Sequence, residues 1–249
     1  MDKQKFADAC SVVAETEREY RQIGTLGEKM LHAVLKHYIE PDETKHEIKV
    51  GSFHADIVNE NGIYEIQTRA FNALRKKLAY FLTISPVTIV YPLPKTKWLL
   101  WIDKQTGEVT KKRKSPKQGR IYDAIHELYK IRPILVNPDL KLHIVFIDME
   151  EYRYLDGWSE DKKKGSSRYD RHPVEIIDEA VINTKSDYLQ FIPSDLQEKF
   201  TTKDYKQAAK VNLSTSQTLL NILNYIGVVK RVGKKGNLHI YERSVFYMQ

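Results

Sequence analysis

Hydrophobic and polar positions alternate along this chain with two different periods, which separate helices from strands. Apolar residues recur at helical spacing in three segments of the first half, at residues 2–20, 28–38 and 71–84. Runs rich in β-branched residues predict strands at residues 46–50, 53–58, 63–68 and 87–91. The order therefore predicts two helices, a three-stranded meander, a crossover helix and a strand parallel to the end of the meander.

The alternation of strands and helices continues beyond this core. The pattern predicts, in order, a hairpin, a helix and a strand at residues 98–112, 120–131 and 141–148. Residues 156–173 contain Gly, Ser, Pro and a lysine run, and they form either a surface loop or a boundary. Residues 174–182 predict a strand or a short helix.

The C-terminal region changes character and predicts three short helices. The first starts at Ser194 and runs to Phe200, and the second runs from a cap at Thr202 to Lys210. The third helix opens with a capping box that has Ser214 as its N-cap, with Gln217 three residues later, and it ends at Gly227.

Two strands at residues 228–232 and 238–241 follow and flank a basic, glycine-containing turn. Three helices and a basic two-stranded wing resemble a winged helix-turn-helix domain over residues 195–245. Such domains bind DNA, and they also serve in dimerisation or protein binding. We expect two domains, at residues 1–190 and 191–249.

The most informative segment is the pair of strands joined through Asn61-Gly62, a strong hairpin signal. Side chains alternate along a strand, so every second residue shares a face. The polar residues expected on one face are Asp56 on the first strand and Glu65, Gln67 and Arg69 on the second. Two carboxylates can thus converge on one point, and hard cations such as Mg²⁺ prefer oxygen ligands.

Asp56 followed by Glu65-Ile66-Gln67 resembles the core motif of the PD-(D/E)xK, restriction-endonuclease-like nucleases. The Glu-x-Gln form is similar to that of competence-protein CoiA-like members, and the resemblance covers residues 25–91. It implies an α/β fold with a restriction-endonuclease-like mixed sheet flanked by helices. The cofactor that it implies is Mg²⁺ or Mn²⁺.

The resemblance also assigns roles to individual residues. Asp56 and Glu65 would be the main metal ligands, with the Ile66 carbonyl oxygen as a third and Glu28 as an accessory ligand on the preceding helix. A metal held in this way activates water and stabilises charge on the phosphate.

Gln67 stands where the family usually has lysine, and its neutral amide cannot offset a developing negative charge. Three cations near the motif could supply that charge: Arg69, Lys76 and Lys77. Lys77 is the preferred helix candidate because it flanks the buried stripe of its helix.

Two alternatives stay open at this point. Asp56 and Glu65 could form an ion pair with Arg69 or a helix lysine on a solvated sheet face. The domain could also be a degenerate nuclease that binds DNA without cutting it.

A net charge of +7 and a pI near 9.2 favour a polyanionic partner, although solubility alone could explain them. The candidate DNA contacts in the middle of the chain are Lys111, Lys112, Arg113, Lys114, Lys117 and Arg120, which could equally be a solvated hairpin edge. The candidate contacts in the C-terminal region are Thr215, Ser216, Gln217, Lys230, Arg231, Lys234 and Lys235.

The single cysteine, Cys10, permits no intramolecular disulfide, which fits a reducing compartment. No apolar signal core or membrane-spanning run is present, so we expect a cytoplasmic protein without a membrane partner.

Together these features predict a Mg²⁺-dependent DNA endonuclease that a winged-helix domain tethers to DNA. The alternative is a catalytically inactive, nuclease-like DNA-binding regulator or repair accessory protein, and an RNA-directed nuclease is a third reading. Many double-strand cutters use two active sites, so a homodimer is an open expectation.

Overall fold

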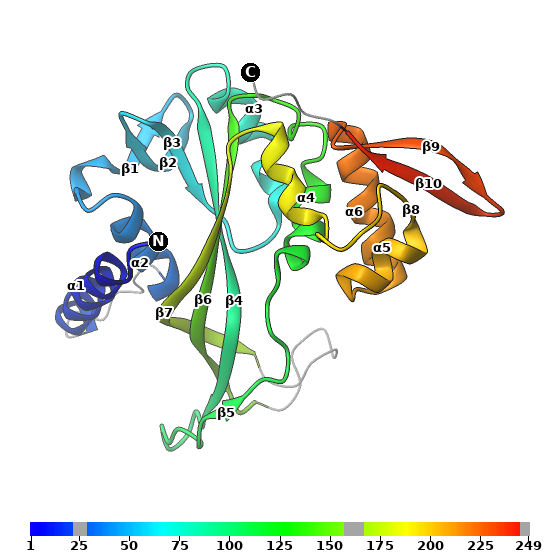
Figure 1. The fold of residues 1–249 in the computed structure, drawn as a ribbon. Coiled ribbons are helices and arrows are strands. Elements are labelled where there is room, and N and C mark those ends of the chain that lie inside the picture. Colours follow the sequence, from blue (N-terminus) through cyan, green and yellow to red (C-terminus); the bar gives the residue numbers. More distant parts are fainter. Residues whose placement is uncertain (22–28, 157–166, 245–249) are drawn as a thin grey trace.

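The centre of the molecule is a twisted mixed sheet (Figure 1) in a computed structural model that describes residues 1–21, 29–156 and 167–244. Its strands lie in the order β1-β2-β3-β4-β6-β7, and the short β5 pairs with the second half of β4. The strands are β1 His46–Val50, β2 Phe53–Asn59, β3 Gly62–Ile66, β4 Val87–Ile102, β5 Arg113–Lys114, β6 Leu140–Tyr154 and β7 Arg168–Ile182.

The first three strands form an antiparallel meander, and β4 then joins β3 in parallel. β6 is parallel to β4, and β7 returns antiparallel to β6. The helical segments between the parallel strands are η2 Phe71–Leu74 with α3 Arg75–Phe81, and η3 Ile121–Ala124 with α4 Ile125–Lys130. The predicted meander, crossover helix and parallel strand are confirmed, as is the mixed α/β class with helices flanking the sheet.

β4 is far longer than predicted because it passes through two prolines. The prediction stopped at Tyr91, and proline cannot donate to a ladder. In the structure Pro92 and Pro94 stay within β4, opposite Val145 and Ile147 of β6, and the register shifts just after Pro94. Parallel pairing with β6 thus carries the strand on to its end.

β6 and β7 are also longer than predicted. β6 continues to Tyr154 and β7 starts at Arg168, so part of the expected loop at residues 156–173 is strand. The predicted strand at residues 174–182 is the second half of β7, which decides between the strand and the short helix.

The predicted hairpin over residues 98–112 is much reduced. Its first arm belongs to β4, and the second arm contributes one isolated bridge, between Ile102 and Val109. The chain pairs again with β4 at β5, beyond the predicted arm.

Helices cover both faces of the sheet, and each face has its own hydrophobic cluster. The first helices are α1 Lys3–Arg21 and α2 Met30–Ile39, followed by the 3-10 turn η1 Glu43–Lys45. α1 and α2 pack on one face, where Val34 and Leu35 contact a cluster that includes Ile57 and Ile66. The other face carries α3 and α4 and the C-terminal helices.

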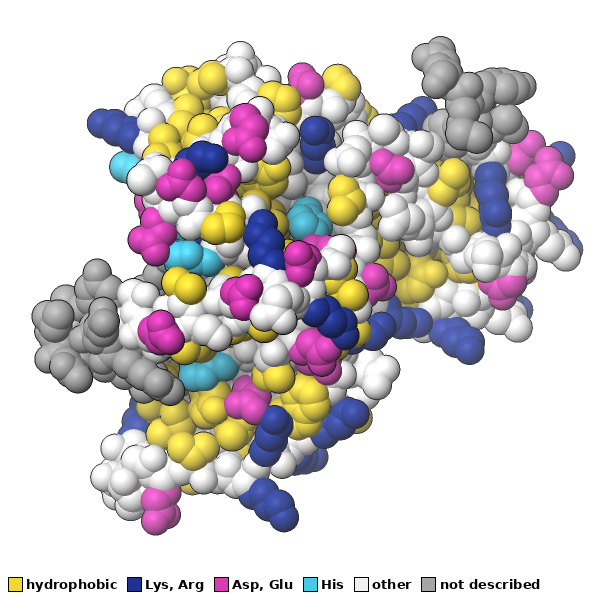
Figure 2. All heavy atoms as spheres, turned by 60° about the vertical axis from the view of Figure 1, so that its left-hand side comes forward, with side chains coloured by type: hydrophobic (Ala, Val, Ile, Leu, Met, Phe, Trp, Pro, Cys, Tyr) yellow, Lys and Arg dark blue, Asp and Glu magenta, His cyan; other side chains and the backbone are white. Residues whose placement is uncertain are grey.

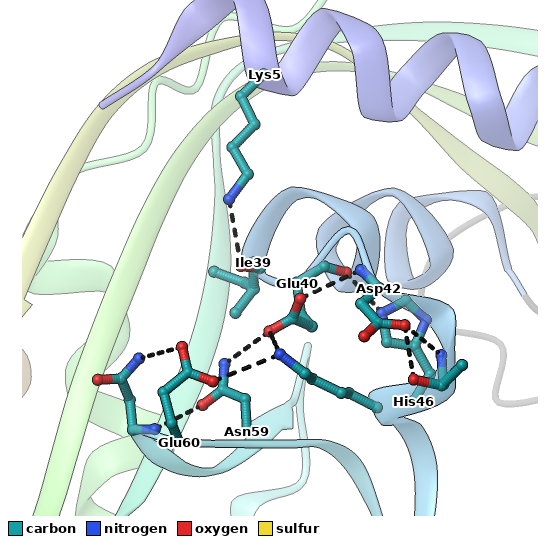
Figure 3. A network of polar contacts seen from close by, with 10 residues as sticks. Lys5, Ile39, Glu40, Asp42, His46, Asn59 and Glu60 are labelled. Carbon is teal, nitrogen blue, oxygen red and sulfur yellow. Dashed lines mark hydrogen bonds and ion pairs between the residues drawn. The ribbon is translucent and has the colours of Figure 1, made fainter.

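A buried carboxylate fixes the end of α2 to the first strands (Figure 3). Glu40 is 8% exposed and accepts hydrogen bonds from Asn59 Nδ2 (3.1 Å), Lys45 Nζ (3.3 Å) and the Asp42 N–H (3.2 Å). Burial raises the pKa of Glu40, but these donors outweigh it and lower the pKa. The His46 ring lies 2.7 Å from the Glu40 carbonyl oxygen, so α2 and β1 are also joined directly.

The C-terminal part forms a helical unit with its own small sheet. Its elements are η4 Lys185–Phe191, β8 Lys199–Thr201, α5 Thr202–Ala209, α6 Leu213–Ile226, β9 Val229–Lys235 and β10 Leu238–Arg243. The strands lie in the order β8-β10-β9, and the β9–β10 hairpin projects away from the main sheet (Figure 1). The prediction of a helix over residues 194–200 is wrong, because a turn there leads into β8.

Two helix caps of this unit differ from the prediction by one or two residues. Thr201, not Thr202, caps α5, and Asn212, not Ser214, caps α6. Asn and Ser are equally good N-caps, so the local pattern could not separate them. Gly227 ends α6 in a left-handed conformation (φ +78°), as predicted.

The C-terminal unit packs against the main sheet through α4. Leu128 of α4 belongs to the same hydrophobic cluster as Leu219 and Leu223 of α6. Arg132 Nη1 donates to Asn221 Oδ1 at 2.5 Å at the edge of this contact. Within the described part of the chain, no helix combines the length and apolarity needed to cross a bilayer.

Candidate active site

Asp56 and Glu65 lie where β2 and β3 separate. The regular ladder of this hairpin ends at the pair Ile57–Tyr64. Beyond it, carboxylates replace main-chain acceptors: the Ile66 N–H donates to Asp56 Oδ2 at 2.6 Å, and the Asp56 N–H donates to Glu65 Oε1 at 3.4 Å. The two side chains therefore occupy the same point between the strands.

The turn at Gly62 fixes the register of the β2–β3 hairpin, which places Asp56 opposite Glu65. Gly62 has φ +123°, and a β-carbon there would lie 2.4 Å from the Pro86 carbonyl oxygen, which already accepts the Ile63 N–H at 2.9 Å. Only glycine fits this approach. The tight hairpin then brings Asp56 opposite Glu65 a few residues further on.

Each carboxylate has a nitrogen partner from a different helix. His32 Nε2 on α2 lies 3.2 Å from Asp56 Oδ2, and Lys77 Nζ on α3 lies 2.6 Å from Glu65 Oε2. The Asp56 and Glu65 side chains are only 13% and 3% exposed. A helix lysine does pair with Glu65, as one alternative had it, but the pair is buried and not on a solvated face.

The two carboxyl groups have opposite pKa shifts. Burial and the nearby negative charge of Asp56 raise the pKa of Glu65 to about 7, against the opposing effect of Lys77. Burial also raises the pKa of Asp56, but His32, the Ile66 N–H and the charge of Lys77 together bring it below its usual value. Asp56 is thus ionised at neutral pH, whereas Glu65 is poised to exchange a proton.

Gln67 and Arg69 do not continue the face that Glu65 occupies. β3 ends at Ile66, and Ala70 turns the chain with a left-handed φ of +58°. The Gln67 side chain donates to the Arg69 carbonyl oxygen. The expectation that strict strand alternation would extend to Arg69 is therefore wrong, because the strand stops first.

The donor set suits a hard divalent cation in chemical type, since it offers two carboxylates and the adjoining Ile66 carbonyl. The hydrogen bonds to the Asp56 carboxylate given above all fall on Oδ2. Glu28, the predicted accessory ligand, lies outside the described residues. Among the residues described, no three His, Cys, Asp or Glu side chains cluster as metal ligands.

The basic run between β4 and α4 is partly engaged in contacts within the protein. Lys112 Nζ lies 2.6 Å from Glu150 Oε1 and also covers the ring of Trp98, and Lys117 Nζ lies 3.1 Å from Asp123. The other lysines and arginines of the run are exposed, namely Lys111, Arg113, Lys114 and Arg120.

Arg120 has a structural role that its sequence context did not indicate. Its guanidinium donates to the Ala209 carbonyl oxygen at 2.8 Å and to the Lys210 carbonyl oxygen at 2.9 Å. These are the last carbonyls of α5, which lack helical partners. Arg120 therefore joins the C-terminal unit to the main sheet.

Two of the predicted C-terminal DNA contacts are buried, which corrects the prediction that their side chains are available for such contacts. Thr215 and Ser216 are 8% and 0% exposed, because this side of α6 packs inward. Thr215 Oγ1 lies 3.4 Å from His126 Nε2 of α4, and the Ser216 hydroxyl donates to the Asn212 carbonyl oxygen. The remaining predicted contacts are exposed, namely Gln217, Lys230, Arg231, Lys234 and Lys235.

A polar groove of about 390 Å³ runs between α6 and the β9–β10 hairpin, with Gln217 and Arg231 in its lining. On the main body, the face in Figure 2 mixes acidic and basic side chains without one continuous patch of either sign.

Sequence reasoning missed three residues near the site. His32 belongs to no ligand spacing, and only the packing of α2 over β2 brings it to Asp56. Arg168 and Arg171 fell in the expected loop, yet they lie on β7 and line a pocket that also contains His32. Strand pairing, which local patterns do not specify, creates these contacts.

A family model matches residues 29–183, more than half of the chain, so the chain belongs to the family described as "Domain of unknown function (DUF8091)". The match contains Asp56, Glu65 and Lys77 and ends just after β7. A Treponema pallidum (strain Nichols) protein described as "Uncharacterized protein" is 28% identical over 229 residues, covering 89% of this chain and 88% of that protein. No solved structure matches the chain.

Proposed function

We propose that the chain is a Mg²⁺-dependent DNA endonuclease of the PD-(D/E)xK, restriction-endonuclease-like type. The observation that carries the proposal is the buried pairing of Asp56 with Glu65 at the point where two strands separate, with Lys77 Nζ 2.6 Å from Glu65. Asp56, Glu65 and the Ile66 carbonyl would hold the metal, which supplies charge neutralisation at the phosphate and an activated water.

The chain's own residues divide the remaining work. Asp56 is held ionised and oriented by His32 and the Ile66 N–H, so its position is fixed before a substrate arrives. Lys77 provides the positive charge that Gln67 lacks, and it reaches the site from α3 and not from β3. The function of the usual strand lysine is thereby moved to a neighbouring helix.

The C-terminal unit would bind DNA as a winged helix-turn-helix domain. The order α5, α6 and the β9–β10 hairpin supports this, as do the exposed basic residues of the hairpin, Lys230, Arg231, Lys234 and Lys235. The buried Thr215 and Ser216 take no part in it, so contact would come from Gln217 and the hairpin.

Plasmid nicking with Mg²⁺ or Mn²⁺ tests the proposal. Asp56→Asn and Glu65→Gln should abolish cleavage, whereas Glu60→Gln should keep it. Glu60 is a matched control, since it is an exposed carboxylate on the turn of the same hairpin. Equal cleavage by the parent and the two site variants would reject a nuclease centre here.

A catalytically inactive, DNA-binding regulator or repair accessory is the second candidate. It is favoured by the Glu65–Lys77 ion pair, which compensates the buried carboxylate without a metal. Calorimetric titration with Mn²⁺ separates the two, because only a nuclease centre would take up the ion in a way that depends on Asp56.

Sedimentation on DNA of known length would test the expected homodimer.

A further inference from the structure

A second charged centre lies on the long arm of the sheet, around a carboxylate that solvent does not reach. Glu151 of β6 is 0% exposed. Among the described residues, four cations from three strands surround it: Lys97 Nζ at 3.2 Å, Arg153 Nη2 at 2.5 Å, Arg171 Nε at 3.1 Å and Arg168 Nε at 3.6 Å.

The positive charge in this cluster exceeds what Glu151 can neutralise. Burial raises the pKa of Glu151, but the charges of Lys97 and the arginines prevail and lower it to about 2, so the carboxylate is ionised at neutral pH. Burial and the neighbouring Arg171 lower the pKa of Arg168. A single carboxylate thus holds several mutually repelling cations in place, an arrangement that a second anion would stabilise.

Two of these cations, Arg168 and Arg171, line a pocket of about 280 Å³. It lies between the start of α2, the segment after β3, and β7. Its basic lining residues are Lys29, Arg69, Arg168 and Arg171. His32, which contacts Asp56, also lines it, so the pocket adjoins the candidate active site.

Among the residues that the structure describes, one acidic side chain, that of Asp170, lines the pocket, and its carboxylate is already engaged. Asp170 Oδ1 accepts the Arg171 N–H at 2.8 Å, and its Oδ2 lies 3.6 Å from His172 Nε2. A main-chain hydrogen bond with Met30 adds to the donors that lower the Asp170 pKa. Its charge is therefore offset locally, and the pocket keeps its positive character.

We propose that this pocket binds a phosphate group of a polynucleotide strand, through Arg69, Arg168 and Arg171, next to the Asp56–Glu65 centre. Guanidinium groups match phosphate oxygens with two parallel hydrogen bonds, and Glu151 holds two of the arginines in position for this. The inference deepens the proposed nuclease function and rests on it for the choice of a polynucleotide. The phosphate is either a terminal monoester or an internal diester.

The test uses the full chain in EDTA, so that binding is measured without cleavage. The probes are inorganic phosphate, followed by phosphorus NMR line broadening, and a 3′-labelled 12-nucleotide strand with or without a 5′-phosphate, followed by anisotropy at fixed ionic strength. Arg168→Gln and Arg69→Ala should each weaken phosphate and strand binding by about tenfold. Arg69 is exposed, so its variant remains informative if Arg168→Gln is unstable.

Arg153→Gln is the matched control. Arg153 contacts Glu151 as Arg168 does but does not line the pocket, so its variant should bind phosphate and both strands as the parent does. If strand affinity depends on the 5′-phosphate, the bound group is a terminal monoester. If the pocket variants lose the same affinity for both strands, it is an internal diester. Parental affinity in both pocket variants, or an equal loss in Arg153→Gln, would overturn the proposal.

Failure of the phosphate-site proposal is distinguishable from failure of the nuclease function. Asp56→Asn and Glu65→Gln remove no pocket cation and should retain phosphate binding in EDTA. If the parent binds phosphate through the arginines but never nicks DNA, the pocket stands and the nuclease assignment falls.

Discussion

Lys77 Nζ lies 2.6 Å from Glu65 Oε2, although the two residues come from different layers of the fold. Glu65 is on a central strand, and Lys77 is on the helix that crosses from β3 to β4. The short connection through Ala70 and η2 is what returns α3 over the strand that precedes it. The contact therefore depends on the helical crossover between two parallel strands and not on neighbouring positions in one strand.

Loss of the Lys77 charge should separate catalysis from DNA binding. Lys77→Met keeps much of the side-chain volume over Phe81 but leaves Glu65 without its cation. We expect nicking to fall at least about 100-fold, the magnitude typical for a charge-stabilising group. DNA affinity in EDTA should stay close to that of the parent.

Lys76→Met is the control for that experiment. Lys76 has the same charge one residue earlier on α3, and it is exposed. Nicking at the parental rate by Lys77→Met, or an equal loss in Lys76→Met, would contradict the role assigned to Lys77.

Glu65 should make the stability of the fold depend on pH. Its pKa rises from 4.5 to about 7 on folding, so the folded state favours the protonated carboxyl. The resulting stabilisation is complete below about pH 4.5 and is lost as the pH rises through about 7. A shift of this size corresponds to a decrease on the order of 3 kcal/mol in the free energy of unfolding.

Urea unfolding in EDTA at several pH values between about 4 and 8 measures this effect. Glu65→Gln has no carboxyl to titrate at this position, so its free energy of unfolding should not show the decrease that Glu65 causes as the pH rises. Glu60→Gln should show that decrease in full. Parallel pH profiles for the parent and Glu65→Gln would show that folding does not raise the Glu65 pKa.

The sequence was sufficient to predict the position of Asp56 opposite Glu65, for a local reason. Residue alternation and the glycine turn at Gly62 specify the hairpin within ten residues. Gln67 and Arg69 were misplaced because the strand ends at Ile66, and the left-handed turn that follows occurs at an alanine, which gives no such signal.

Other parts of the candidate site depend on contacts between distant segments. Arg171 meets Glu151 only because β7 pairs with β6 in one particular register. Thr215 was predicted as a DNA contact from its place in the region that resembles a winged helix, yet it is buried beside His126 of α4. Short hydroxyl side chains satisfy their hydrogen bonds within the helix or with a neighbour, so polarity alone does not place them outside.

Arg120 should contribute to stability more than to DNA binding. Its guanidinium satisfies the Ala209 and Lys210 carbonyls at the end of α5, so Arg120→Ala should destabilise the protein by about 1 kcal/mol. Arg113→Ala, in the same basic run but exposed on β5, should leave stability unchanged. Thermal and urea unfolding check both, and equal stability of the two variants would argue against the contact.

The hairpin lysines should set the salt dependence of DNA binding. Lys234 and Lys235 are exposed on β9, and each phosphate contact that is lost should reduce the slope of log affinity against log salt by about 1. Lys234→Ala/Lys235→Ala should therefore bind duplex DNA more weakly and with a slope smaller by up to about 2. Fluorescence anisotropy over a series of salt concentrations gives both quantities.

Thr215→Val completes that experiment, because it changes a predicted contact that the structure buries. Valine preserves the shape of the side chain but cannot make the contact with His126. The fold and the DNA affinity should both be retained. If Thr215→Val weakens DNA binding as much as the double lysine variant while its unfolding curve matches the parent, α6 must present that side to DNA. The hairpin would then not be the main contact of the C-terminal unit.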